Sequence, residues 1–91
     1  MNQETRKATH ALIAKLADLK EEVEAQRETL ESLAEDEREK FDNLSEGLQA
    51  SEKGEAIDQA ANNLEEAYIT LESAVDSIDE TIATLEATIE E

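Results

Sequence analysis

The chain contains no cysteine, no proline and no tryptophan, and its 91 residues include one tyrosine and one phenylalanine. Without cysteine, neither a disulfide nor a thiolate metal site can form. With two glycines and 2% aromatic residues, the chain lacks the turn formers and bulky residues typical of β-rich folds. No apolar run approaches the roughly 20 residues of a membrane span, and the start, Met1 to Glu4, lacks the basic-then-apolar pattern of a signal peptide. We expect one all-α, cytoplasmic domain over residues 1–91.

Basic residues are scarce and unevenly placed. The formal net charge is −17; residues 1–40 hold 7 basic and 11 acidic side chains (net −4), whereas residues 41–91 hold 1 and 14 (net −13). Such a surface disfavours direct binding to nucleic acid or to an anionic membrane.

A heptad repeat occupies residues 57–89. Its apolar positions alternate with spacings of four and three, which place them on one stripe of a helix that must find a partner helix. One series is Ile57, Leu64, Leu71, Ile78 and Leu85, and the other is Ala61, Tyr68, Val75, Ile82 and Ile89.

A similar stripe earlier in the chain predicts a first helix from about residue 4 to about residue 42, followed by a connector over about 43–51 and a second helix over about 52–90. Two helices of equal length joined by a short connector are typical of an antiparallel, coiled-coil-like hairpin. The expected contribution of the first helix to the hairpin core is Leu12, Leu16, Leu19, Val23, Gln26, Leu30 and Leu33.

Folding the chain at Gly47 pairs the two stripes. Val23 then meets Leu71, Gln26 meets Tyr68 within hydrogen-bonding reach, and Lys20 lies near Asp79. In the connector, Ser45 is expected to cap a single helical turn and Ser51 to cap the second helix. Gly54, in the first turn of that helix, costs about 1 kcal/mol relative to alanine, and the sequence does not show why it is there.

Small residues form a further row beside the core of the second helix: Ala60, Ala67, Ala74 and Thr81. One partner helix covers two positions per heptad, and this helix offers three. The surplus predicts a homodimer or higher oligomer, most simply a four-helix bundle. The alternative is that these alanines only favour helix formation.

Residues that carry chemistry are few. His10 is the only histidine, and no Glu-x-x-His pair, calcium loop, phosphate loop or nucleophile–base pair occurs. We expect no catalytic, metal-binding or cofactor-binding site, and no enzyme activity.

A recognisable pattern lies between residues 37 and 75. Its positions are Phe41, Asp42, Asn43, Leu44, Glu46, Leu48, Gln49, Lys53, Gly54, Glu55, Ala56, Leu64, Glu65 and Ala67. This pattern resembles that of small, uncharacterised, acidic helical proteins encoded by bacteriophages, prophages and other mobile elements. Members often place proline where this chain has Ser45. The resemblance implies a mobile-element source and the cytoplasm of a bacterial host, and it supplies no activity.

Three functions fit these patterns. The first is a small interaction or regulatory protein that binds and modulates a host protein. The second is a DNA mimic that blocks a host nuclease or another nucleic-acid-binding protein, and the third is sequestration of a small ligand at an oligomer interface. Dense negative charge also keeps small proteins soluble without any further role. The acidic surface expected to bind a partner comprises Glu65, Glu66, Glu72, Asp76, Asp79, Glu80 and Glu86.

Overall fold

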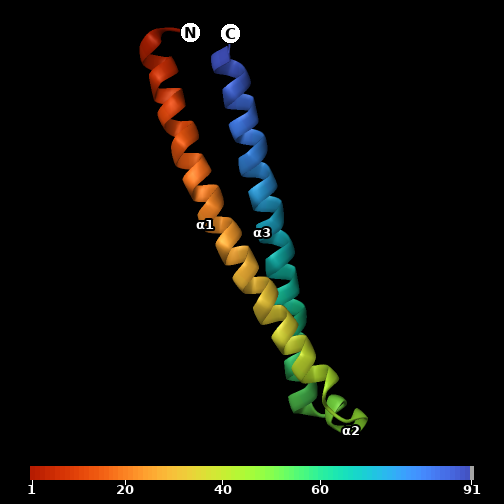
Figure 1. The fold of residues 1–91 in the computed structure, drawn as a ribbon. Coiled ribbons are helices and arrows are strands. Elements are labelled where there is room, and N and C mark those ends of the chain that lie inside the picture. The colour runs from red at the N-terminus through yellow and green to blue at the C-terminus, as the bar shows by residue number, and fades with distance from the viewer. Residues whose placement is uncertain (91) are drawn as a thin grey trace.

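The computed structural model, which describes residues 1–90, is a thin rod of two long helices. Helix α1 spans Gln3–Asp42, the single turn α2 spans Glu46–Gln49, and α3 spans Glu52–Glu90. The chain reverses at α2, so that α1 and α3 run antiparallel and both ends of the chain lie at the same end of the rod (Figure 1). The rod measures 68 × 15 × 15 Å. The expected all-helical architecture with two long packed helices is confirmed over residues 1–90.

Polar side chains fix the helix ends. The Asn2 side chain accepts a hydrogen bond from the backbone N–H of Thr5 at 2.8 Å and so caps α1. Ser45 caps α2 by accepting from the Leu48 N–H, and the Ser51 hydroxyl accepts from the Gly54 N–H at 3.2 Å at the start of α3. At the open end of the rod, the Arg6 guanidinium donates to the backbone carbonyl of Ile89. None of the helices within residues 1–90 is long and apolar enough to cross a membrane.

Gly54 is required by the tight reversal of the chain. It is buried, and a Cβ atom built on it would lie 2.2 Å from the backbone oxygen of Leu48 and 2.6 Å from that of Gln49. Backbone atoms of α2 therefore occupy the space that any larger residue would need. The side chain of Gln49 also donates to the Phe41 carbonyl at 3.1 Å, which ties α2 to the end of α1. The tip is a packed corner of the fold.

The interior of the hairpin is shallow. Among residues 1–90 the buried apolar side chains are Ala34, Ala61 and Val75, and no large side chain is completely buried. The expected core positions of α3 are nevertheless turned toward α1. They are buried or half-buried: Ile57, Ala61, Leu64, Tyr68, Leu71, Val75, Ile78, Ile82 and Leu85.

Helix α1 is rotated relative to the expectation. Leu16, Val23 and Leu30 are half-buried against α3, but the neighbouring row that lies with them in the contact is Ile13, Lys20, Arg27 and Ala34. This rotation brings the long side chains of Lys20 and Arg27 over α3, where their stems pack and their charged ends reach acidic or aromatic partners. The row expected in that place is exposed instead: Leu12, Leu19, Gln26 and Leu33.

Candidate interaction surfaces

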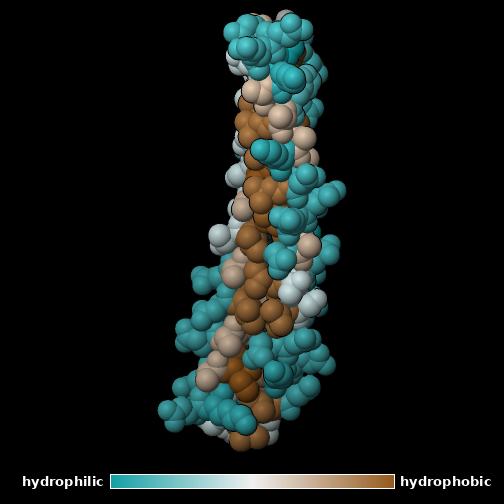
Figure 2. All heavy atoms as spheres, turned by 90° about the vertical axis from the view of Figure 1, so that its left-hand side faces the viewer, coloured by the Kyte–Doolittle hydropathy of each residue, from teal (hydrophilic) through white to brown (hydrophobic). Residues whose placement is uncertain are grey.

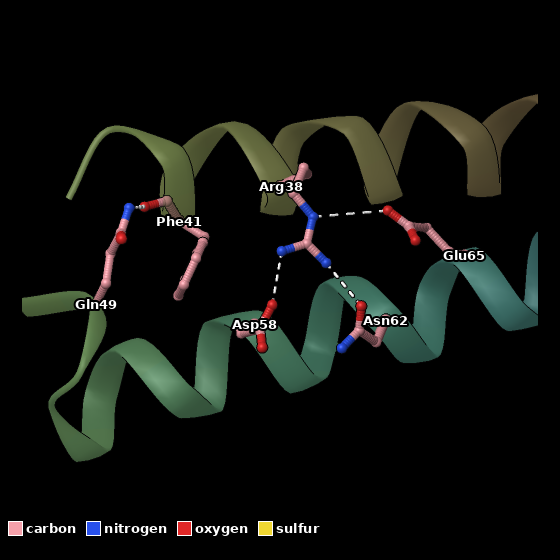
Figure 3. A network of polar contacts seen from close by, with 6 residues as sticks. All are labelled: Arg38, Phe41, Gln49, Asp58, Asn62 and Glu65. Atoms are coloured by element: carbon pink, nitrogen blue, oxygen red, sulfur yellow. Dashed lines mark hydrogen bonds and ion pairs between the residues drawn. The ribbon is translucent and has the colours of Figure 1, made fainter. Parts of the chain in front are cut away.

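Arg38 joins the two helices near the tip of the rod. Its Nη1 lies 2.6 Å from Asp58 Oδ1, its Nη2 donates to Asn62 Oδ1 at 2.7 Å, and its Nε lies 3.6 Å from Glu65 Oε1 (Figure 3). The three acceptors follow one another at spacings of four and three along α3, which matches the planar fork of a guanidinium. Arg38 Cζ also lies 5.7 Å from the centre of the Phe41 ring. The hydrogen bond to Asp58 and the charges of Asp58 and Glu65 raise the pKa of Arg38.

Lys20 makes a second bridge farther along the same side of the rod. Its Nζ lies 2.6 Å from Asp79 Oδ1, as the facing registers predict, and 3.9 Å from Glu24 on its own helix. The hydrogen bond to Asp79 and the nearby acidic charges raise the pKa of Lys20. The three ion pairs that join α1 to α3 within residues 1–90, two from Arg38 and one from Lys20, therefore lie on one edge of the hairpin.

Tyr68 belongs to this edge as well. The Glu31 carboxylate beside its hydroxyl, together with burial, raises the pKa of Tyr68. The guanidinium of Arg27 lies over the ring, with Cζ 5.9 Å from its centre. The expected partner, Gln26, is exposed on the other side of α1 because of the helix rotation.

We call this side of the rod the charged edge; its acidic row on α3 is Glu65, Glu72, Asp79 and Glu86. A seven-residue repeat keeps such a row nearly straight along a helix. All the side chains of the expected acidic surface are exposed, including Glu66, Asp76 and Glu80 beside the row. Only Glu65 and Asp79 of that set are engaged by cations within residues 1–90. Most of these carboxylates are therefore available to a partner.

The opposite side of the rod is uncharged along two rows. We call it the uncharged face and define it by Leu12, Leu19, Gln26 and Leu33 of α1 with Ala60, Ala67, Ala74 and Thr81 of α3. The three leucines keep 46, 45 and 46% of their surface exposed. Leu33 and Ala60 line one open groove, which brings the two rows together there, and charged side chains border the same groove: Asp36, Glu37, Glu39 and Lys40. Leu19 and Gln26 line a second groove with Leu71 of α3 and Glu22. Figure 2 shows a hydrophobic strip that runs along one face of the rod between hydrophilic margins.

Within residues 1–90 no group of three or more His, Asp or Glu side chains is arranged to hold a metal ion. His10 is exposed on α1. The features that stand out are instead the two long surfaces, one acidic and one uncharged.

No protein-family model, curated protein or solved structure matches this chain. The function is therefore argued from the chemistry of the two surfaces.

Proposed function

We propose that this protein is an acidic helical interaction protein: two hairpins assemble into a four-helix bundle, and the carboxylates outside the bundle bind and modulate another protein. The observation that carries the proposal is the division of the rod into a charged edge and an uncharged face. An uncharged apolar face suits permanent packing, whereas exposed carboxylates suit reversible contact with a basic surface. The resemblance to mobile-element proteins supports a bacterial host as the source of the partner.

A sharper form of this function is mimicry of duplex DNA, and the charge density favours it as the second candidate. Two copies would carry twice the net charge of −17 along a rod 68 Å long, or one negative charge per about 2 Å. Duplex DNA carries one per about 1.7 Å of its axis. The partner would then be a host nuclease or another protein with a DNA-binding groove.

Capture from a bacterial lysate tests the role of the acidic surface. The bait is the wild-type chain beside a variant with Glu72→Gln, Asp76→Asn and Glu80→Gln, three exposed side chains that take part in no ion pair within residues 1–90. We expect wild type to retain proteins with basic surfaces that a rising salt gradient releases, since screening weakens contacts between exposed charges. The variant should lose them.

A matched control carries the same change of charge on the outer side of α1: Asp18→Asn, Glu21→Gln and Glu28→Gln, which are also exposed. Equal loss in both variants would mean that only net charge matters and would argue against a specific acidic surface. Capture of nothing by wild type would count against the proposed function altogether.

Duplex DNA of matching length separates the two candidates. A duplex of about 20 base pairs spans the same length as the rod. If it displaces the captured protein, the partner uses its DNA-binding groove and mimicry is supported. Retention of the captured protein in excess DNA would contradict mimicry and leave the general binding role.

A further inference from the structure

The uncharged face leaves large apolar side chains of α1 exposed to water. Three leucines with nearly half of their surface exposed follow one another on α1, and the small residues of α3 lie next to them. The two rows cover 22 residues of each helix, about 33 Å along the rod at 1.5 Å per residue, so a helical partner laid along them contacts several turns of both helices. The hairpin itself buries no large side chain completely within residues 1–90. A partner on this face would supply the missing core.

The charge distribution identifies a second copy as the occupant. Each chain has a net charge of −17, and the uncharged face is where two such chains can meet with little repulsion. Along α3 the residues bordering the small row on its outer side are also uncharged: Ala56, Asn63, Thr70, Ser77 and Thr84. The rows themselves carry no carboxylate, and the carboxylates of Glu22, Asp36, Glu37 and Glu39 line parts of the grooves beside them. The face therefore fits an uncharged apolar surface, which the chain itself provides.

Two arrangements of the hairpins can bury this face. In the first, both tips lie at the same end and α1 of each copy packs against α3 of the other. In the second, the hairpins lie head to tail and like helices face each other. Neighbouring helices in a bundle are about 8–10 Å apart, and diagonal ones are then about 14 Å apart. Only the first arrangement puts the two strongly acidic α3 helices on the diagonal, farther apart than the Debye length of about 8 Å at physiological ionic strength.

Side-chain size favours the same arrangement. The leucine row of α1 and the alanine row of α3 occupy the same stretch of the rod, since Leu33 and Ala60 line one groove. In the first arrangement the copies are related by a two-fold rotation about an axis parallel to the rod. This rotation leaves each residue at the same height along the rod, so that leucines of one copy meet small residues of the other. Large side chains opposite small ones interdigitate at even helix spacing. In the head-to-tail arrangement, leucines would instead face leucines and alanines would face alanines.

We propose that a second copy of this chain packs on the uncharged face with both tips at the same end, so that Leu33, Leu19 and Leu12 of each copy lie against Ala60, Ala74 and Thr81 of the other. This inference rests on the bundle named in the proposed function and specifies its residues and orientation. Gln26 falls within the leucine row and opposes the alanine row, where it faces the interior of the bundle.

Cysteine cross-linking tests the orientation, because the native chain has no cysteine and each introduced thiol is unique. Leu33→Cys and Ala60→Cys are made in separate chains with tags of different size, mixed, refolded together and oxidised. A disulfide needs Cα atoms within about 7 Å. We expect the mixed Leu33–Ala60 product to predominate and neither variant to cross-link with itself. A mixed product between Leu12→Cys and Leu33→Cys chains would overturn the proposal in favour of the head-to-tail arrangement.

Sedimentation of the purified chain tests the assembly independently of any binding partner. We expect wild type to sediment as a dimer. Ala67→Lys should raise the dissociation constant of the dimer at least a hundredfold, because the substitution buries a charge in the interface. Ser73→Lys makes the same change of charge at an exposed position of α3 outside the face and should leave the dimer intact. A monomeric wild type, or equal effects of the two lysines, would overturn the proposal, whereas loss of lysate binding with an intact dimer would contradict only the proposed function.

Discussion

Asp58 on α3 accepts the shortest of the three contacts that Arg38 makes from α1, with Nη1 and Oδ1 separated by 2.6 Å. Lysine cannot reproduce this fork, because a single ammonium cannot reach Asp58, Asn62 and Glu65 together. We predict that Arg38→Lys lowers the melting temperature and that Arg38→Met lowers it further, as measured by circular dichroism.

Lys40→Met is the matched control for Arg38→Met, since Lys40 is paired with Glu37 on its own helix at 2.8 Å. Both substitutions remove one positive charge, but only Arg38 joins α1 to α3. If the two variants lost the same stability, the bridge between the helices would have no specific effect.

Substitution of Gly54 by alanine should destabilise the hairpin although alanine favours helix. The propensity gain of about 1 kcal/mol is opposed by contact of the new Cβ with the backbone oxygens of Leu48 and Gln49. Overpacking of this kind costs about 1–3 kcal/mol, and more where backbone must move. Urea unfolding is the measurement.

Gly47→Ala is the comparison for this prediction, because nothing lies within 4 Å of the added Cβ at that position. It should stabilise the chain by about 0.4–1 kcal/mol through a less flexible unfolded state. If Gly54→Ala had the same free energy of unfolding as wild type or a higher one, as Gly47→Ala is expected to have, the tip would accommodate the added Cβ without cost.

The single tyrosine gives a direct optical titration. Glu31 and Arg27 from α1 and Glu72 from α3 are the charged groups that affect Tyr68, and the pKa of Tyr68 is raised above 10.0. The tyrosinate absorbance of the folded chain should therefore rise at a higher pH than that of the chain unfolded in urea. Glu31→Gln should move the midpoint back toward 10, and Glu28→Gln, which does not contact the ring, should not.

The same shift has a consequence for stability. A group whose pKa is higher in the folded state stabilises the fold while it is protonated, so this contribution is present below pH 10 and is lost as pH rises through the folded midpoint. The raised pKa of Lys20 acts in the same direction above its ordinary value of 10.5. We expect the melting temperature to fall in this alkaline range, and less steeply in Tyr68→Phe.

Salt should stabilise the protein. With a net charge of −17 in a rod 15 Å wide, like charges repel one another in the folded state. Raising NaCl from about 0.02 to about 0.5 M shortens the Debye length to a few ångströms and should raise the melting temperature by several degrees. The Glu72→Gln, Asp76→Asn and Glu80→Gln variant should show a smaller rise. A melting temperature independent of salt in both chains would contradict strong self-repulsion.

The helices and their order could be predicted from the sequence because the apolar residues of α3 keep one register from Ile57 to Ile89. That series contains no competing row of large apolar residues, so the face turned toward α1 was unambiguous. The serines at 45 and 51 marked the starts of α2 and α3, because their hydroxyls satisfy N–H groups that would otherwise lack partners.

The face of α1 was not predictable in the same way. Leucines at 12, 19 and 33 rank above Lys20 and Arg27 by hydrophobicity, which suggested that they lie in the hairpin core. In the structure, the cations occupy that position because their ends find Asp79 and the Tyr68 ring on α3. The bridge made by Arg38 was also missed, although Asp58, Asn62 and Glu65 show the four-three spacing that could have revealed it. The reason for Gly54 required the position of α2, which no local pattern contains.

The close contact between Gly54 and α2 also determines where each chain ends its first arm. If the corner opened, α1 and α3 could continue as one straight helix, and the second arm would pack against another molecule in place of its own first arm. Exchange of arms in this way produces intertwined dimers and, when it does not close, fibres. The close packing of backbone oxygens of α2 against Gly54 therefore opposes the exchange of arms between molecules.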